Sequence, residues 1–247
     1  MKKKILSICL VAVIAVMAIT GASLAYLTDT DAEDNVFTVG NVKIDLTENF
    51  NESLAHLIPA TGSAQAGTLE NGITKEVFVT NTGSEKAYVR VHIAVPALLD
   101  NGDPSFDAGK NLLHFNYDDT NIGEGKWDWS NATGTPYEGN WNFYTTKINN
   151  IDYNVYVVTY EKELAKDETT VSAMSQVYLD SKVTNADIDR IKETLGDQWH
   201  VFVAAEGVQS KGFDDAYTAL NTAFGIPGGY TVNWTAAAGV DTIVGEQ

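Results

Sequence analysis

The chain has 247 residues, of which 44% are hydrophobic, so it can bury a sizeable core and its composition argues against wholesale disorder. It holds 16 Lys and Arg against 33 Asp and Glu, a formal net charge of −17 at pH 7. This negative field argues against nucleic acids and anionic membrane surfaces as partners, because their phosphates would be repelled. It favours solubility and the binding of cations.

The N-terminus has the three parts of a secretory signal peptide. Lys2–Lys4 form a basic start, Ile5–Ile19 is an apolar run without a charged residue, and Ser23-Leu24-Ala25 fits the small-x-small cleavage pattern. We therefore predict a signal peptide over residues 1–25, with cleavage after Ala25. A retained transmembrane anchor is the alternative, but the run is shorter than the ~20 residues that span a bilayer.

Removal of residues 1–25 would change both charge and cysteine content. The remaining chain would carry 13 basic and 33 acidic residues, a net charge of −20. It would also lose Cys9, the only cysteine of the sequence. We therefore expect a mature protein that has no disulfide, no thiol nucleophile and no thiolate metal site, and that is held together by its core alone.

Strand patterns dominate residues 26–247, which we predict to form a single domain. Val36–Leu46 reads as extended chain, and Thr74–Asn81 and Lys86–Val95 flank a turn-forming cluster, which predicts a hairpin that ends at Pro96. Further strands are expected at Ile151–Tyr160, Val171–Leu179, Trp199–Val208 and Thr231–Trp234, with a weakly structured tail after them.

Two short helices interrupt the strands. Thr184 and Asp187 have the spacing of a capping box, apolar residues follow at helical spacing as far as Leu195, and Gly196 ends the element. A second helix is expected to begin at Asp214 or Asp215 and to end at Gly225. The sum predicts a mostly β fold, an antiparallel two-sheet sandwich of jelly-roll type with short helices in its connections.

Residues 100–147 differ from the rest, because large aromatic rings alternate there with Asn, Asp and Gly. We interpret this stretch as a loop-rich insertion with short strands. Trp127 and Trp129, like Trp141 and Phe143, stand two residues apart, so each pair should project from one face of a strand. Either these rings roof the core of the sandwich, or Trp127, Trp129 and Trp141 form a binding surface that stacks sugar rings or receives a partner chain.

The sequence shows no catalytic constellation. The four histidines stand singly, and H-E-x-x-H, G-x-S-x-G and phosphate-binding glycine motifs are absent. His92 and His200 fall inside predicted strands, where a hydrogen-bonded core or surface histidine is more common than a ligand. Asp29–Asp34 and Asp118–Asn121 fail the EF-hand pattern, but a bound Ca²⁺ or Zn²⁺ stays open, with Asp118 and Asp119 as weak candidates.

Three segments resemble the TasA/camelysin family of secreted Gram-positive proteins. Leu24–Thr30 followed by Asn35–Leu46 is similar to the family opening, in which a signal peptide is followed by an aromatic residue, an acidic spacer and a strand. Lys75–Ser84 is similar to the first internal hairpin, and Phe202–Gln209 to the last long strand. The residues in between, from about 100 to 195, carry no such resemblance.

The resemblance implies a jelly-roll domain that is released by a signal peptidase of the SipW kind and exported to the cell surface or biofilm matrix. It also implies assembly into fibres, in which the freed N-terminal segment of one subunit adds as a strand to the next. We expect residues 26–39 to be this mobile donor segment; its strand-forming residues would be Tyr26, Leu27, Val36, Phe37 and Val39. An open sheet edge would accept it through main-chain hydrogen bonds, and head-to-tail contacts of this kind yield filaments.

Two other functions stay open. Some family members are described as camelysin, a surface metallo-endopeptidase, although no catalytic group is visible in this sequence. A surface module that binds matrix polysaccharide through its tryptophans is the other alternative. The sequence also leaves open whether the protein is a main fibre subunit, an accessory subunit or a monomeric adhesin.

Overall fold

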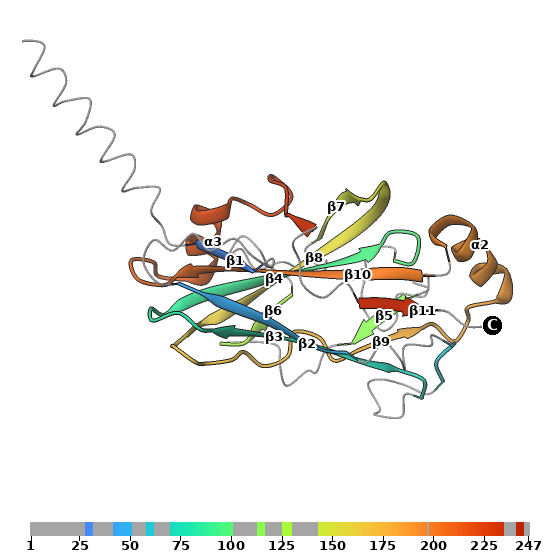
Figure 1. Cartoon of the computed structure of the whole chain (residues 1–247), viewed down its shortest axis with the longest axis horizontal. Coiled ribbons are helices and arrows are strands. Elements are labelled where there is room, and N and C mark those ends of the chain that lie inside the picture. Colours follow the sequence, from blue (N-terminus) through green and yellow to red (C-terminus); the bar gives the residue numbers. More distant parts are fainter. Residues whose placement is uncertain are drawn as a thin grey trace, which may run out of the picture.

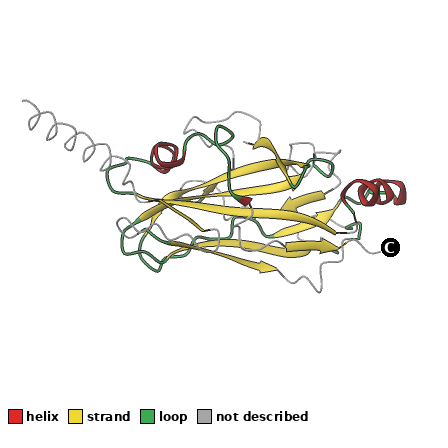
Figure 2. Ribbon diagram, turned by 45° about the horizontal axis from the view of Figure 1, so that its top comes forward, coloured by secondary structure: helices red, strands yellow, loops and turns green. Residues whose placement is uncertain are grey.

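A computed structural model describes residues 28–31, 42–50, 58–61, 70–100, 113–116, 125–129, 143–196, 198–234 and 241–244. In this part of the chain two antiparallel β-sheets pack face to face, and two helices lie in the connections (Figures 1 and 2). The predicted mostly β, two-sheet antiparallel sandwich with short helices is therefore confirmed, whereas its jelly-roll topology stays a prediction.

The larger sheet has a continuous path of five strands with two more at its sides. The path runs through β1 (Thr28–Asp31), β10 (Gln198–Gln209), β4 (Ala87–Pro96), β8 (Ile151–Leu164) and β6 (Trp127–Asp128). β11 (Asp241–Val244) pairs with β10, and β7 (Phe143–Ile148) pairs with β8. Asn149 and Asn150 join β7 to β8, and both have positive φ, 51° and 67°, as a two-residue type I′ hairpin turn requires.

The smaller sheet has the order β2 (Ile44–Phe50), β3 (Ile73–Asn81), β9 (Gln176–Leu179) and β5 (Leu113–Asn116). The irregular segment that leads into β9 also lies along β3. There the side chains of Thr170 and Ser172 take the place of main-chain acceptors, since their oxygens accept from the backbone N–H groups of Val79 and Val77, both at 3.1 Å. The predicted strand 171–179 is thus regular only from Gln176 onward.

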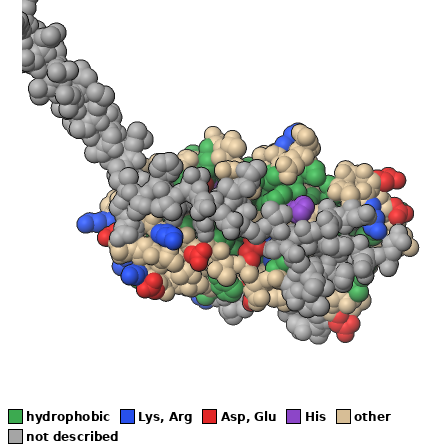
Figure 3. Space-filling view, in the orientation of Figure 1, with side chains coloured by type: hydrophobic (Ala, Val, Ile, Leu, Met, Phe, Trp, Pro, Cys, Tyr) green, Lys and Arg blue, Asp and Glu red, His purple; other side chains and the backbone are tan. Residues whose placement is uncertain are grey.

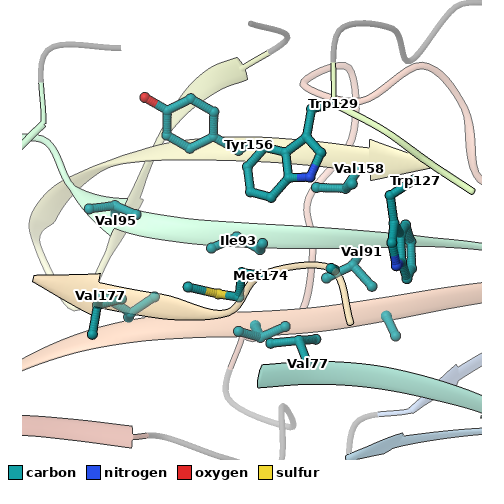
Figure 4. Close-up of a cluster of buried hydrophobic side chains, with 14 of the residues drawn as sticks. Val77, Val91, Ile93, Val95, Trp127, Trp129, Tyr156, Val158, Met174 and Val177 are labelled. Atoms are coloured by element: carbon teal, nitrogen blue, oxygen red, sulfur yellow. The ribbon is translucent and has the colours of Figure 1, made fainter. Parts of the chain in front are cut away.

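The main core lies between the two sheets (Figure 4). Period-2 alternation supplies it, because every second residue of β4, including Val91 and Ile93, faces the smaller sheet and meets Val77 and Val177. Trp127, like Trp129, is buried here, and its indole N–H donates to the carbonyl oxygen of Val171 at 2.7 Å.

The opposite, outer face of the larger sheet is also covered, which explains why every residue of β4 is buried. Helix α3 (Ala216–Phe224) and the segment 225–234 lie over it, and we call these two elements together the cap. The cap seals two apolar clusters against the sheet. One contains Tyr88, Val208, Ala216, Ala219 and Leu220, and the other contains Ala94, Ile148, Tyr153, Val155, Phe202, Ala204 and Trp234.

Both helices begin and end close to where the sequence predicts. Thr184 caps α2 (Asn185–Leu195) in a complete capping box with Asp187, and the chain leaves the helix at Gly196. Asp215 caps α3 by accepting from the N–H of Thr218 at 2.8 Å, and Gly225 ends it. Among the described residues no helix is long and apolar enough to cross a membrane.

The predicted hairpin of Thr74–Asn81 with Lys86–Val95 is wrong, because β3 and β4 belong to different sheets. The connection crosses between the sheets, and the buried side chain of Asn81 holds it: its amide donates to the carbonyls of Glu85 at 2.7 Å and Leu164 at 2.9 Å, and its oxygen accepts from Gly83 N–H. The turn-forming cluster therefore lies in an arch that connects the two sheets, and not in a hairpin. The predicted last strand 231–234 is also wrong, since those residues belong to the cap, and β11 forms in the expected weakly structured tail.

Parts of the predicted insertion 100–147 lie in both sheets. The described pieces form β5, β6 and the start of β7, so they extend the sandwich.

Acidic and basic side chains lie near one another at the left end of the face shown in Figure 3. Basic and acidic side chains also form exposed ion pairs, such as Lys86–Glu163 and Lys162–Glu168.

Candidate functional site

The edge of the larger sheet at β10 is closed by the chain's own N-terminal strand. β1 pairs antiparallel with β10, so that Thr28 is opposite Val208 and Asp31 is opposite Ala205. The other side of the same stretch of β10 pairs with β4. This edge therefore receives a short polar segment, TDTD, by main-chain hydrogen bonding rather than by burial of large apolar side chains.

Gly207 lets β2 approach this edge closely. A Cβ atom built on Gly207 would lie 2.7 Å from Cγ2 of Ile44, closer than real Cβ atoms come to a neighbour. Ile44 is 1% exposed and begins β2 of the other sheet. The two sheets therefore lie close together beside the β1 pairing site, and any Cβ at this point of β10 would force Ile44 to shift.

On the outer face, β10 and β4 are joined by a buried ion pair. Glu206 is directly opposite Arg90 in the register, and Arg90 Nε donates to Glu206 Oε2 at 2.6 Å. The two side chains are 4% and 1% exposed, so water contributes little to solvating either charge. A buried pair of this kind requires further hydrogen bonds around it, and the cap provides them.

Three residues of the cap complete the coordination of these charges. Arg90 donates through Nη1 to Asn221 Oδ1 at 2.8 Å and through Nη2 to the carbonyl of Gly225 at 3.1 Å and to Tyr230 Oη at 2.7 Å. The Tyr230 hydroxyl lies 2.8 Å from both carboxylate oxygens of Glu206, to which it donates. One guanidinium thus links β4, β10, α3 and the segment after α3.

His92 adds a second contact to the same carboxylate. Its Nε2 lies 3.2 Å from Glu206 Oε2, and its Nδ1 lies 3.3 Å from the hydroxyl of Tyr144 on β7. Burial alone would raise the pKa of Glu206, but His92 and Arg90, through charge and hydrogen bonds, lower it to about 2. Burial and then the nearby Glu206 charge raise the pKa of both Tyr144 and Tyr230 well above the usual range, so both hydroxyls keep their protons. We call Arg90, His92, Glu206, Tyr144 and Tyr230 the buried polar cluster.

The cluster belongs to a polar row that crosses the whole larger sheet. In the register Thr30 is opposite Glu206, Glu206 opposite Arg90, Arg90 opposite Thr159, and Thr159 opposite Asp128. Residues that oppose each other directly lie on the same face of a sheet, so this row runs along the outer face from β1 to β6.

Helix α3 is fixed to this row at two points one turn apart. Asn221 accepts from Arg90, and Tyr217 donates to Asp128 Oδ2 at 2.5 Å and lies 3.1 Å from Glu161 Oε1. Burial, and then the contact with Asp128, raises the pKa of Tyr217 far above its usual range, so this hydroxyl remains a donor. The row therefore ties the cap to the sheet through fixed charges and donors. Within the buried polar cluster Arg90, His92 and Glu206 are buried, whereas Tyr144 and Tyr230 are half-buried.

Most of the predicted site residues lie outside the described part of the chain. These are the cleavage residues Ala25 and Tyr26, the donor residues Leu27, Val36, Phe37 and Val39, the ring of Trp141, and the weak metal candidates Asp118 and Asp119. The donor segment 26–39 is described only at Thr28–Asp31, which form β1. No group of three or more His, Cys, Asp or Glu that could hold a metal occurs among the residues that the structure describes.

The predicted aromatic binding surface is wrong for two of its three members. Trp127 is 0% exposed and Trp129 is 1% exposed, and they pack near Tyr160 and Tyr156 of β8. They offer no ring face to a sugar, because both indoles fill the space between the sheets (Figure 4). The alternative interpretation, rings that form part of the core, is the one that holds for this pair.

The sequence reasoning missed the buried polar cluster. His92 and His200 do lie in strands as predicted, the first inside the cluster and the second stacked on Phe202 at 5.7 Å. Arg90 and Glu206 are each a lone charge in an apolar strand: Arg90 stands between Val89 and Val91, and Glu206 between Ala205 and Gly207. A charged residue is rarely buried unless it is paired. Two lone charges of opposite sign in apolar strands therefore indicate a buried ion pair.

Comparison with known proteins adds no identification: no family model matches the sequence, and no curated protein matches it. The class that the fold and the site define is an antiparallel two-sheet β-sandwich whose N-terminal strand closes one sheet edge.

Proposed function

We propose that the protein is a secreted structural subunit of a biofilm matrix or cell surface, which assembles into fibres by donating its N-terminal strand after signal cleavage. The observation that carries the proposal is the pairing of β1 with the β10 edge. In a filament the same edge of one subunit would hold residues 28–31 of the next.

The physical basis is the nature of this pairing. Main-chain hydrogen bonds do not depend on which copy supplies the strand, so a donated TDTD segment satisfies the edge as well as the subunit's own segment does. A head-to-tail exchange does not close on itself, and it therefore extends into a filament. Exchange against an identical segment is energetically balanced, and a strand of four residues has few hydrogen bonds to break before it is displaced.

The predicted cleavage site lies close to the donor. A cut after Ala25 would leave only two residues ahead of Thr28. Before the cut, the apolar run Ile5–Ile19 would tether the donor segment to the membrane or translocation machinery, and a signal peptidase of the SipW kind would release it. Cleavage would then act as the switch between the tethered precursor and the assembling subunit.

Charge would govern the yield of assembly. The net charge of −20 keeps mature subunits apart at neutral pH, so partial neutralisation by low pH or by a divalent cation should make filaments form more readily. Fibre yield that is unchanged between pH 4 and pH 7.5 and indifferent to calcium would count against this part of the proposal.

Negative-stain electron microscopy of three purified proteins tests the function. The first begins at Tyr26, the second carries several additional residues ahead of Tyr26, and the third lacks residues 26–34. Filaments from the first protein alone are the expected result. Filaments of normal length from the third protein would overturn strand donation, and monomers from all three would remove fibre formation as the function.

A further inference from the structure

Every described side of the β10 stretch that receives β1 is held by another element of the same subunit. On the outer face, Glu206 is bound by Tyr230, and Val208 packs against Ala216, Ala219 and Leu220 of α3. On the inner face, Gly207 rests against Ile44 of β2. On the side opposite β1, residues 202–209 pair with β4.

We infer that the cap keeps residues 205–208 of β10 in pairing geometry through the hydrogen bonds of Tyr230 to Glu206, ready to receive a strand from a second copy of this chain, with Tyr230 as the positioning residue. This inference rests on the proposed strand donation for its biological meaning. Its structural content, that the cap fixes the receiving edge, can be tested without any filament.

The geometry favours the cap over the remaining sheet as the fixing element. Removal of β1 leaves an edge strand with pairing on one side only, and such strands fray unless something covers them. The buried charge of Glu206 makes fraying costly here: if residue 206 moved away, Arg90 would keep an unpaired charge beneath the cap. Because the Tyr230 hydroxyl contacts both oxygens of Glu206 and also Arg90 Nη2, it locks the carboxylate in one orientation.

The chain supplies a matched control on the same cap. Tyr217 also places a half-buried hydroxyl on carboxylates of the outer face, but its partners Asp128 and Glu161 belong to β6 and β8, which lie three and two strands away from β10. Tyr217→Phe and Tyr230→Phe each remove one hydroxyl and keep the ring. A general loosening of the cap would make the two variants alike, whereas a specific effect on the receiving edge would separate them.

Hydrogen–deuterium exchange of the mature chain that begins at Tyr26, kept monomeric by dilution, tests the inference. We expect Tyr230→Phe to accelerate exchange of the amides at 205–208 at least about tenfold, since a hydrogen bond to a buried charge is lost, while Tyr217→Phe leaves them unchanged. The same comparison in a chain without residues 26–34 should show a larger difference, because β1 no longer supports the edge.

Equal exchange at 205–208 in Tyr230→Phe and Tyr217→Phe would overturn the inference, as would an acceleration spread evenly over β4, β8 and β10. Filament growth separates this result from the fate of the proposed function. If strand donation is wrong, the unsubstituted protein forms no donor-dependent filaments, whatever the exchange shows. If donation is right and the inference is wrong, Tyr230→Phe assembles at the normal rate.

Discussion

Arg90 and Glu206 face each other across β4 and β10, with Nε and Oε2 2.6 Å apart and with side chains 1% and 4% exposed. They are separated by 116 positions in the sequence, and together they fix the cap, the middle of the larger sheet and the strand that receives β1. The stability of the domain and the readiness of its edge for pairing therefore depend on the same two residues.

Loss of one partner of this pair should cost far more than loss of both. We expect Arg90→Met to lower the free energy of unfolding by about 3–5 kcal/mol, because it leaves the Glu206 charge buried without its counter-ion. The double variant Arg90→Met/Glu206→Leu should be more stable than the sum of the two single effects predicts. Urea denaturation of the four proteins measures the coupling, and additive losses would contradict a direct interaction.

Acid stability should also depend on Glu206. The pKa of its carboxyl lies at about 2 in the folded protein and near 4.5 when it is unperturbed, so the folded state is stabilised by the ionised form. This contribution is complete above pH 4.5 and is lost as the pH falls through about 2; the shift corresponds to about 3 kcal/mol. Glu206→Gln should be less stable than the unsubstituted protein at neutral pH, and the difference should shrink between pH 4.5 and pH 2. A difference that stays constant over this range would contradict the assignment.

A side chain at position 207 should destabilise the domain while Ile44 is present. Gly207→Ala places a Cβ 2.7 Å from Ile44 Cγ2, and we expect a loss of about 1–3 kcal/mol from overpacking. In an Ile44→Ala background the same substitution should cost clearly less, because the clashing atoms are gone. Thermal or urea unfolding of the four proteins measures this difference in cost. An equal loss of stability in both backgrounds would contradict a steric clash between residue 207 and Ile44.

The start of α2 offers a local test far from the receiving edge. Thr184→Ala removes the oxygen that accepts from Asp187 N–H and should destabilise the domain by about 1 kcal/mol. Thr184→Ser keeps that oxygen and serves as the control. Since the capping contacts of α2 involve neither the cap nor the buried polar cluster, neither variant should change exchange at residues 205–208.

The sequence was informative where structure is determined locally. The capping box of Thr184 and the N-cap residue Asp215 lie next to the helices that they begin, so both helices were predictable. The strand predicted at Ile151–Tyr160 from β-branched and aromatic residues lies within β8 in the same way, although β8 continues to Leu164.

Pairing partners were not determined locally. The β3–β4 connection has turn-forming residues that suit a hairpin, but Asn81 joins it to Leu164, 83 positions away, and the chain crosses to the other sheet. The candidate site could not be predicted for the same reason. Arg90, Glu206 and Tyr230 are widely separated in the sequence, and the register of β4 with β10 brings them together. The spacing of Trp127 and Trp129 predicted that they share a face of a strand. It did not determine whether that face lies in the core or binds a ligand, and the structure shows both rings in the core.

The most direct test of strand donation uses the register of β1 with β10. Asp31 is opposite Ala205, and residues 26–247 contain no cysteine, so Asp31→Cys and Ala205→Cys can be made in separate molecules of this segment and mixed during assembly under oxidising conditions. Strand donation predicts disulfide-linked pairs of one Asp31→Cys and one Ala205→Cys subunit within filaments, while the double variant in a single chain should lock as a monomer and assemble only after reduction. Filaments from the mixture without this cross-link, or filaments from the oxidised double variant, would contradict the account.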